Sequence, residues 1–181
     1  MNNDVESVLI SEEELKQICK SLGDQITRDY EGKNLLVVSV LKGSVVFLAD
    51  LLREIKCHCQ IDFLSVSSYS GTKTTGVVRF KKDLDIDPDG MDILIVEDIL
   101  DSGITLSYLS GVLMGRNANS IKICTLLDKP ANRKADIKAD YVGRVIPDAF
   151  VIGYGLDYDE KYRNLPYIGI LKPAVYEQKG E

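Results

Sequence analysis

Several residue types are scarce in this chain of 181 residues, and each scarcity excludes a class of protein. The chain has one histidine and four cysteines. Four scattered cysteines cannot form the disulfide framework of a small secreted domain, so we expect free thiols in a protein of the reducing cytoplasm. A Ser-His-Asp or Cys-His mechanism would have to use His58, and no G-x-S-x-G motif accompanies it.

Long apolar runs and excess basic charge are also missing. The longest apolar run, around Leu35 to Leu41, is far shorter than a membrane span needs, and the acidic start MNNDVESVLISEEE does not resemble a signal peptide. The chain carries 22 basic against 28 acidic residues, a net charge of −6. We therefore expect neither a membrane nor a nucleic acid as partner, because a nucleic-acid footprint needs a basic face.

The length and composition are those of one globular domain that spans residues 1–181. Hydrophobic residues make up 45% and charged residues 28% of the chain, close to the globular average. A chain of this length builds a hydrophobic core without needing disulfide bonds or bound metals to stabilise it. We see no internal repeat and no Pro/Ser-rich linker that would divide it.

Apolar periodicity predicts alternating strands and helices. Short apolar runs predict strands at about residues 35–40, 57–67, 93–96, 121–127 and 149–152. Helical spacing predicts a helix behind the Ser11–Glu14 capping box, a second over 45–52 that Ser44 can cap, and a third with Leu106, Leu109 and Leu113 on one face. Alternating strands and helices favour an α/β fold with a parallel sheet. Ligands of such sheets bind beyond the carboxyl ends of the strands.

The most informative of these strand ends runs from Glu97 to Thr105. It brings three carboxylates into five positions, and their mutual repulsion calls for a hard cation or for substrate hydroxyls. Ser102-Gly-Ile-Thr105 then supplies hydroxyls and the first amides of a helix, which is an anion-binding turn. The segment therefore fits a sugar-phosphate ligand, although an acidic loop that caps a helix would explain the same spacing.

Two other segments only resemble metal sites. Asp85-x-Asp87-x-Asp89-Gly90 matches the first half of a calcium-binding EF-hand loop, but position twelve is Val96 and not glutamate. Cys57-His58-Cys59 lacks the second Cys/His pair that a tetrahedral zinc site requires.

The Glu97–Thr105 segment also carries a resemblance to a known family. Its sequence VEDILDSGIT resembles the phosphoribosyl-pyrophosphate (PRPP) signature of type I phosphoribosyltransferases. Four further segments, in order along the chain, resemble the bacterial hypoxanthine-guanine phosphoribosyltransferases: LKG, SSYSG, LLDKP and FVIGYGLDYDEKYRNLPYIG. The match runs from about Leu35 to Gly169.

The resemblance implies a fold and an activity. The fold would be a parallel twisted sheet flanked by helices, with a core at about residues 35–148 and a small C-terminal hood, mainly 149–181, to which the N-terminus contributes. The activity would be purine salvage with Mg²⁺, in which a homodimer or homotetramer transfers 5-phosphoribose from PRPP to N9 of a 6-oxopurine and releases pyrophosphate. The alternatives are a sister enzyme for a base such as xanthine and a non-catalytic PRPP sensor.

The resemblance also implies roles for the phosphoribosyl-contacting residues. Asp101 would be the acid/base beside N7 of the purine. The 5′-phosphate would lie in the loop formed by Asp101, Ser102, Gly103, Ile104 and Thr105. The carboxylates expected to serve the ribose hydroxyls and Mg²⁺ are Glu97, Asp98 and Asp157. Some family members have Lys at the position of Ile104, and the loss of that charge bears on phosphate affinity.

Roles for the remaining matched residues follow from the same resemblance. Pyrophosphate would contact Lys42, Gly43 and Arg163, and the Leu41–Lys42 peptide would be cis. The purine would contact Lys129 at its 6-oxo group, Phe150 on its ring, and Val151 and Asp157 at its edge. Ser68 and Tyr69 would belong to a closing loop. Without the resemblance, Lys129 and Arg163 are ordinary surface charges and Phe150 is an ordinary core residue.

Overall fold

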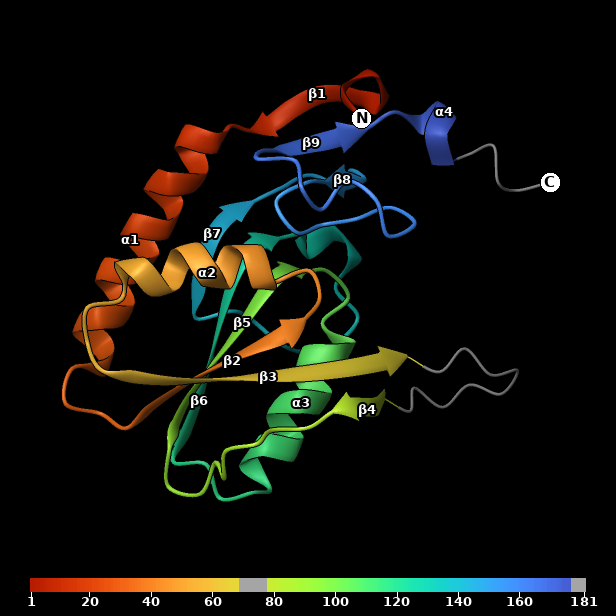
Figure 1. The fold of residues 1–181 in the computed structure, drawn as a ribbon. Coiled ribbons are helices and arrows are strands. Elements are labelled where there is room, and N and C mark those ends of the chain that lie inside the picture. The colour runs from red at the N-terminus through yellow and green to blue at the C-terminus, as the bar shows by residue number, and fades with distance from the viewer. Residues whose placement is uncertain (69–77, 177–181) are drawn as a thin grey trace.

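Two β-sheets organise the chain (Figure 1). The structure is a computed structural model that describes residues 1–68 and 78–176. The strands of the larger sheet, in spatial order, are β4 (Val78–Lys82), β3 (Cys59–Ser68), β2 (Leu35–Leu41), β5 (Asp92–Leu100), β6 (Ser120–Asp128) and β7 (Tyr141–Val145). They run parallel except β4, which is antiparallel to β3. The predicted α/β class with a parallel sheet is confirmed.

Helices cover both faces of this sheet, as Figure 1 shows. α1 (Glu12–Tyr30) and α2 (Val45–Glu54) pack on one face, and α3 (Ile104–Met114) packs on the other. Alternate residues of β2 therefore enter different cores: Val37 joins the α1–α2 side and Val38 joins the α3 side. Strands buried on both faces explain the unbroken apolar runs in the sequence. No helix within the described ranges is both long and apolar enough to cross a membrane.

The two predicted helix caps have different outcomes. The Ser11–Glu14 capping box is confirmed, because Ser11 Oγ accepts from the Glu14 amide at 3.3 Å and Glu14 Oε2 accepts from the Ser11 amide at 2.8 Å. The prediction that Ser44 caps α2 is wrong. Its hydroxyl is fully buried and donates instead to the Val40 carbonyl at 2.6 Å, which satisfies it inside the core.

The strand order reverses between β2 and β5. The chain continues from β2 outward to β3 and from β5 outward to β6, on opposite sides of this pair. The β2–β5 ladder ends at Ser39 and Val96, so the last residues of the two strands separate. Such a switch point is where open α/β sheets bind ligands.

The strand predicted at residues 93–96 extends further than expected. β5 continues to Leu100, because β6 supplies ladder partners as far as the Leu100–Asp128 pair. Glu97 and Asp98 are thus strand residues, and successive strand side chains point to opposite faces of a sheet.

The smaller sheet joins the two ends of the chain. β1 (Val5–Ile10) pairs antiparallel with β9 (Ile168–Leu171), which pairs antiparallel with β8 (Val151–Ile152). The predicted strand at 149–152 is therefore wrong in its place, because it reduces to β8 in this second sheet. Two strands of the larger sheet were missed, β4 with its basic sequence VRFKK and β7, where Gly143 and Arg144 interrupt any apolar run. The remaining elements are short: η1 (Asn2–Asp4), η2 (Pro130–Asn132) and α4 (Pro173–Tyr176).

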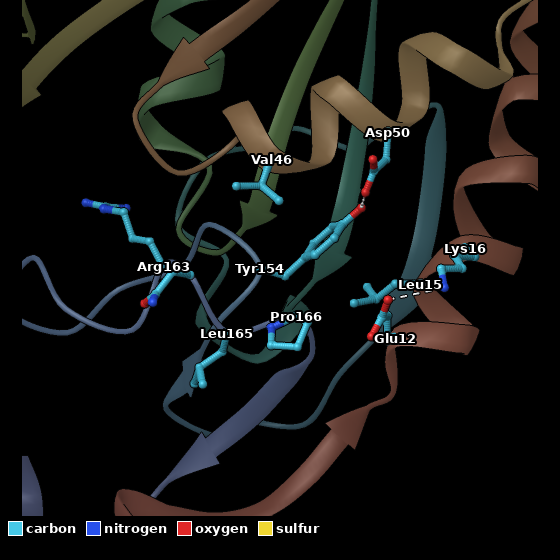
Figure 2. A pocket seen from close by; sticks show the side chains of 10 residues that line it. Glu12, Leu15, Lys16, Val46, Asp50, Tyr154, Arg163, Leu165 and Pro166 are labelled. Carbon is cyan, nitrogen blue, oxygen red and sulfur yellow. Dashed lines mark hydrogen bonds and ion pairs between the residues drawn. The ribbon is translucent and has the colours of Figure 1, made fainter. Parts of the chain in front are cut away.

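Tyr154 ties the segment after β8 to the helices of the larger sheet. Its hydroxyl donates to Asp50 Oδ2 of α2 at 2.6 Å and lies 3.6 Å from Cys19 Sγ of α1. Figure 2 shows this ring beside a pocket of about 250 Å³, with the Arg163 side chain pointing away from it. Tyr154 thereby fixes where the loop containing Gly155 and Arg163 sits against the core.

We predict that Tyr154→Phe lowers the stability of the protein. Removal of the hydroxyl deletes one hydrogen bond to a carboxylate, worth about 1 kcal/mol, which for a chain of this size lowers Tm by about 2–4 °C. Thermal unfolding measures this. Tyr167→Phe is the control, since the Tyr167 hydroxyl makes only a 3.3 Å contact to the exposed Asn2. An equal fall in Tm in both variants would contradict the stabilising role of the Tyr154 hydroxyl.

Candidate functional site

Three chain segments meet tightly at Gly43. A Cβ atom there would lie 1.7 Å from Asp98 Oδ2, so no side chain fits. Gly155 approaches from the segment after β8, where its φ of +101° suits glycine and an added Cβ would lie 2.0 Å from the Gly43 carbonyl oxygen. The Leu41–Lys42 peptide before Gly43 is cis, as the resemblance implied.

The two cations expected at the pyrophosphate are paired with carboxylates here. Lys42 Nζ lies 3.0 Å from Glu160 Oε2, and an Arg163 terminal nitrogen lies 2.9 Å from Asp157 Oδ1 and 3.4 Å from Glu160 Oε2. Asp157 Oδ2 also accepts from the Glu160 amide at 2.9 Å. Arg163 Nε is buried without a hydrogen-bond partner among the described residues. Lys42, Asp157 and Arg163 are therefore brought together, and their charges are available to an incoming ligand only by exchange of partners.

Glu97 and Asp98 form an acidic pair at the end of β5. Burial raises the pKa of Glu97 well above its ordinary value, and the neighbouring Asp98 charge raises it further. Burial also raises the pKa of Asp98 to about 6, although a backbone hydrogen bond from Ile99 and the charge of Arg163 oppose that rise. Neither carboxylate forms an ion pair with any residue of the described ranges. The charged forms are thus poorly compensated.

A pocket of about 150 Å³ opens on the other face of β5, beside Glu97. It is lined by Asp101, Ser102, Gly103 and Thr105 among others, so the predicted anion-binding turn forms a real concavity at the start of α3. Gly103 adopts φ +77°, the left-handed conformation that glycine tolerates. Asp101 Oδ1 is buried and has no hydrogen-bond partner among residues 1–68 and 78–176. The Ile104 side chain is exposed and is not among those that line the pocket, so this position brings no charge to it.

Lys129 is largely buried and faces Asp101. Its Nζ lies 3.6 Å from Asp101 Oδ2 and 3.2 Å from Asp148 Oδ1, and its side chain is only 11% exposed. A lysine that has lost most of its water needs such carboxylate partners. The structure therefore joins the ends of β5 and β6 through one charged contact.

The remaining predicted residues lie at or near β8 and at the end of β3. Phe150 is 39% exposed and stacks on Tyr176 with ring centroids 5.1 Å apart, while Val151 is buried and pairs with Ile170. Ser68 ends β3, and Tyr69 lies outside the described residues.

Comparison with known proteins decides the family. The family model for the phosphoribosyl transferase domain matches residues 9–159, which is most of the chain. The chain belongs to the phosphoribosyl transferase family. This phosphoribosyl transferase is 58% identical over 178 residues to the hypoxanthine-guanine phosphoribosyltransferase of Bacillus subtilis (strain 168), across 98% of this chain and 99% of that relative.

Solved structures agree with this assignment. A crystal structure of a hypoxanthine phosphoribosyltransferase from Staphylococcus aureus superposes on this phosphoribosyl transferase with a TM-score of 0.94 and 56% identity, and covers 97% of this chain and 96% of its own. A hypoxanthine-guanine phosphoribosyltransferase from Bacillus anthracis superposes with a TM-score of 0.87 and 48% identity, over 93% and 98% of the two chains. The fold implied by the resemblance is therefore that of the family.

Sequence reasoning missed the acidic partners of the predicted cations. Glu160 holds Lys42 and Arg163, and Asp148 holds Lys129. Glu160 lies inside one of the segments that carried the resemblance and Asp148 lies just before it, so their position was a usable signal. Lys42 and Lys129 directly follow β2 and β6, and periodicity does not reveal that these strand ends meet the two acids.

The carboxylates of this phosphoribosyl transferase fit a magnesium ion that takes most of its ligands from water and substrate phosphates. No three His, Cys, Asp or Glu side chains group as a metal cage in the part of the chain that the structure describes. Glu97 and Asp98 nevertheless offer uncompensated carboxylate oxygens. Mg²⁺ commonly binds through one or two carboxylates together with water and substrate phosphates.

We predict that Glu97→Gln stabilises the ligand-free protein near neutral pH. An acid whose pKa is raised by folding favours the fold while it is protonated and loses that contribution as pH rises through the folded pKa. Thermal unfolding should therefore show a Tm higher than that of the unmodified protein at about pH 8, with a smaller gap at about pH 5. The exposed Glu13→Gln serves as control. If Glu97→Gln had a lower Tm than the unmodified protein at the higher pH, this would contradict the claim that the Glu97 charge is uncompensated.

Proposed function

We propose that the chain catalyses purine salvage, in which the 5-phosphoribosyl group of PRPP is transferred to hypoxanthine or guanine. The products are IMP or GMP and pyrophosphate. One observation carries the proposal: Asp101 presents a buried, unpartnered carboxylate oxygen beside the largely buried Lys129 and the anion-binding turn. The names of two relatives at 58% and 56% identity support it, since both are hypoxanthine-guanine phosphoribosyltransferases.

The anion-binding turn is the proposed 5′-phosphate site. Small side chains and the glycine N-cap place the first backbone amides of α3 beside this pocket, where a phosphate would replace Ser102 Oγ as the partner of the Ile104 amide. The positive end of the α3 dipole adds to this attraction. Asp101, at the start of the turn, would then lie where the ribose joins the base.

The opposite side of the switch point is the proposed pyrophosphate site. Lys42, Gly43 and Arg163 would contact pyrophosphate, with close backbone approach at Gly43. The pyrophosphate charge would replace Glu160 as the partner of Lys42. These cations would stabilise the leaving group where its negative charge develops.

Mg²⁺ is the proposed cofactor. Glu97 and Asp98 would hold it or the ribose hydroxyls, and Asp157 would serve a second ion. When bound, Mg²⁺ supplies positive charge against the diphosphate oxygens.

The base site is proposed around Lys129. Lys129 would donate to the 6-oxo group, Phe150 would pack on the ring, and Val151 and Asp157 would meet the purine edge. As the bond between C1′ and the pyrophosphate oxygen breaks and the bond between C1′ and N9 forms, Asp101 accepts the N7 proton. A closing loop with Ser68 and Tyr69 would exclude water from the oxocarbenium-like centre.

The proposed working form is a cytoplasmic homodimer or homotetramer of one-domain chains. Four free thiols are in keeping with a reducing compartment. The core at about 35–148 would carry the phosphoribosyl contacts, and the hood at 149–181 with β1 would cover the base.

Pyrophosphate release from PRPP tests the function most simply. The assay supplies hypoxanthine, guanine, xanthine or adenine, with Mg²⁺ and again with excess chelator. Release with hypoxanthine or guanine that chelator abolishes is the expected result. Release with xanthine alone would indicate the sister enzyme, and PRPP binding without release would indicate a sensor.

We predict that Asp101→Asn lowers kcat far more than it raises KM for either substrate. A positioned acid–base group contributes about 10²- to 10⁴-fold, and asparagine keeps the shape of the side chain while losing the base. Steady-state kinetics measures the split. Asp136→Asn, an exposed acid nearby, is the control and should keep the unmodified kcat. A kcat for Asp101→Asn equal to that of the control would remove Asp101 from the chemistry.

We predict that Lys129→Gln weakens discrimination against adenine. Adenine presents an amino donor where hypoxanthine presents an oxygen acceptor, and a buried donor that faces a donor costs about 1–3 kcal/mol. The ratio of kcat/KM for hypoxanthine to that for adenine should fall by about 10-fold or more, since 1.4 kcal/mol corresponds to one decade. Lys138→Gln, on an exposed lysine, should leave the ratio unchanged. A ratio in Lys129→Gln equal to that of the unmodified enzyme would contradict the assignment.

A further inference from the structure

Arg133 makes the densest set of side-chain contacts near the proposed base site, and neither the sequence analysis nor the proposed mechanism uses it. Its side chain is only 17% exposed and follows η2 back toward the ends of β5 and β6. Nε donates to the Asp101 carbonyl at 2.9 Å, and one terminal nitrogen donates to the Leu100 carbonyl at 3.2 Å. The same nitrogen pairs with Asp128, and the other donates to the Ile137 carbonyl at 3.0 Å.

These contacts fall on both strands that deliver the base-facing groups. Leu100 ends β5 and Asp101 follows it directly, while Asp128 ends β6 immediately before Lys129. The Lys129 amide also donates to the Leu100 carbonyl at 3.0 Å, so the two strand ends form one bonded unit with Arg133 at its centre.

The Asp101 backbone depends on the Arg133 guanidinium for its position more than the Ser102 backbone does. Ser102, the next residue, has anchors of its own, because its carbonyl accepts from the Lys134 amide at 2.9 Å and from the Ala135 amide at 3.1 Å. The Asp101 side chain has only the 3.6 Å ion pair with Lys129 among the described residues.

We infer that Arg133 is a positioning residue that holds Asp101 in register with Lys129 for proton transfer at the base. The inference rests on the proposed function. The side-chain hydrogen bonds of Arg133 all go to groups of the protein, so the role inferred for it is indirect. A lysine cannot replace it, because one ammonium lacks the planar fork that reaches three carbonyls and a carboxylate in different directions.

The geometry predicts a particular kinetic signature. Loss of the fork frees Asp101 to shift, and a shift of about 1 Å in a catalytic group can cost 10²-fold in rate. The phosphate turn from Ser102 onward keeps its two backbone anchors, so PRPP binding should change little. A residue that only stabilised the fold would not separate kcat from KM in this way.

The test compares Arg133→Lys with the unmodified enzyme and with Arg116→Lys. Arg116 is a matched control, since it pairs with Asp83 through two bonds of 2.8 and 2.7 Å but lies between α3 and the start of β6, whereas Arg133 contacts the end of that strand. In Arg133→Lys, kcat should fall about 10- to 100-fold while KM for PRPP stays near that of the unmodified enzyme. Arg116→Lys should lower only Tm. In Arg133→Ala, added guanidinium ion should restore part of the lost kcat.

Three outcomes would overturn the inference: an unchanged kcat in Arg133→Lys, an equal fall in Arg116→Lys, or a rise in KM for PRPP that matches the fall in kcat. If Arg133→Lys does not fold, Asp128→Asn decides, since it loosens the clamp without removing it. A smaller fall in kcat at constant KM supports the inference, and no fall overturns it. A lack of turnover in the unmodified enzyme would overturn both the proposed function and this inference. Turnover in the unmodified enzyme together with one of the three outcomes above would overturn the inference alone.

Discussion

Two adjacent, half-buried carboxylates near the end of β5 are the constraint on which the site depends. Glu97 and Asp98 lie where β2 and β5 separate, and burial raises the pKa of both. Their surroundings accommodate this charge but do not cancel it, since Gly43 leaves room for Asp98 and no ion pair forms with either acid in the described ranges. Sites that destabilise the empty protein in this way are characteristic of function.

The cations of the site form ion pairs with acids other than Glu97 and Asp98. Lys42 pairs with Glu160, Arg163 with Asp157, and Lys129 with both Asp101 and Asp148. Each pair is partly solvated, so an anionic ligand can replace the acid without leaving a buried charge alone. A substrate with several phosphate groups and a metal ion matches this arrangement of acid-paired cations beside two carboxylates without ion pairs, and in this way the electrostatics supports the proposed substrate PRPP.

Much of this could be predicted from the sequence, and the failures have physical causes. The four apolar runs of the parallel sheet and the Ser11 cap were predicted because they report local burial and local hydrogen bonds. β7 and β1 were missed because strands that expose one face to polar surroundings carry no apolar run. The pairing of Lys129 with Asp148 and the contacts of Arg133 were missed because their partners come from separate segments of the chain, which only folding brings together. The end of β5 was misplaced because its acidic residues resemble a loop until β6 pairs with them.

The pKa values of Glu97 and Asp98 test the account most directly. Carboxyl-carbon NMR can follow each titration in the unmodified protein, with Glu97→Gln and Asp98→Asn to assign the signals. In the ligand-free protein both pKa values should lie above those of ordinary carboxyls, with that of Asp98 at about 6, and both should fall when Mg²⁺ and PRPP bind. Ordinary pKa values in the ligand-free protein, or values that do not move on binding, would contradict the claim that this site is built around uncompensated buried acid.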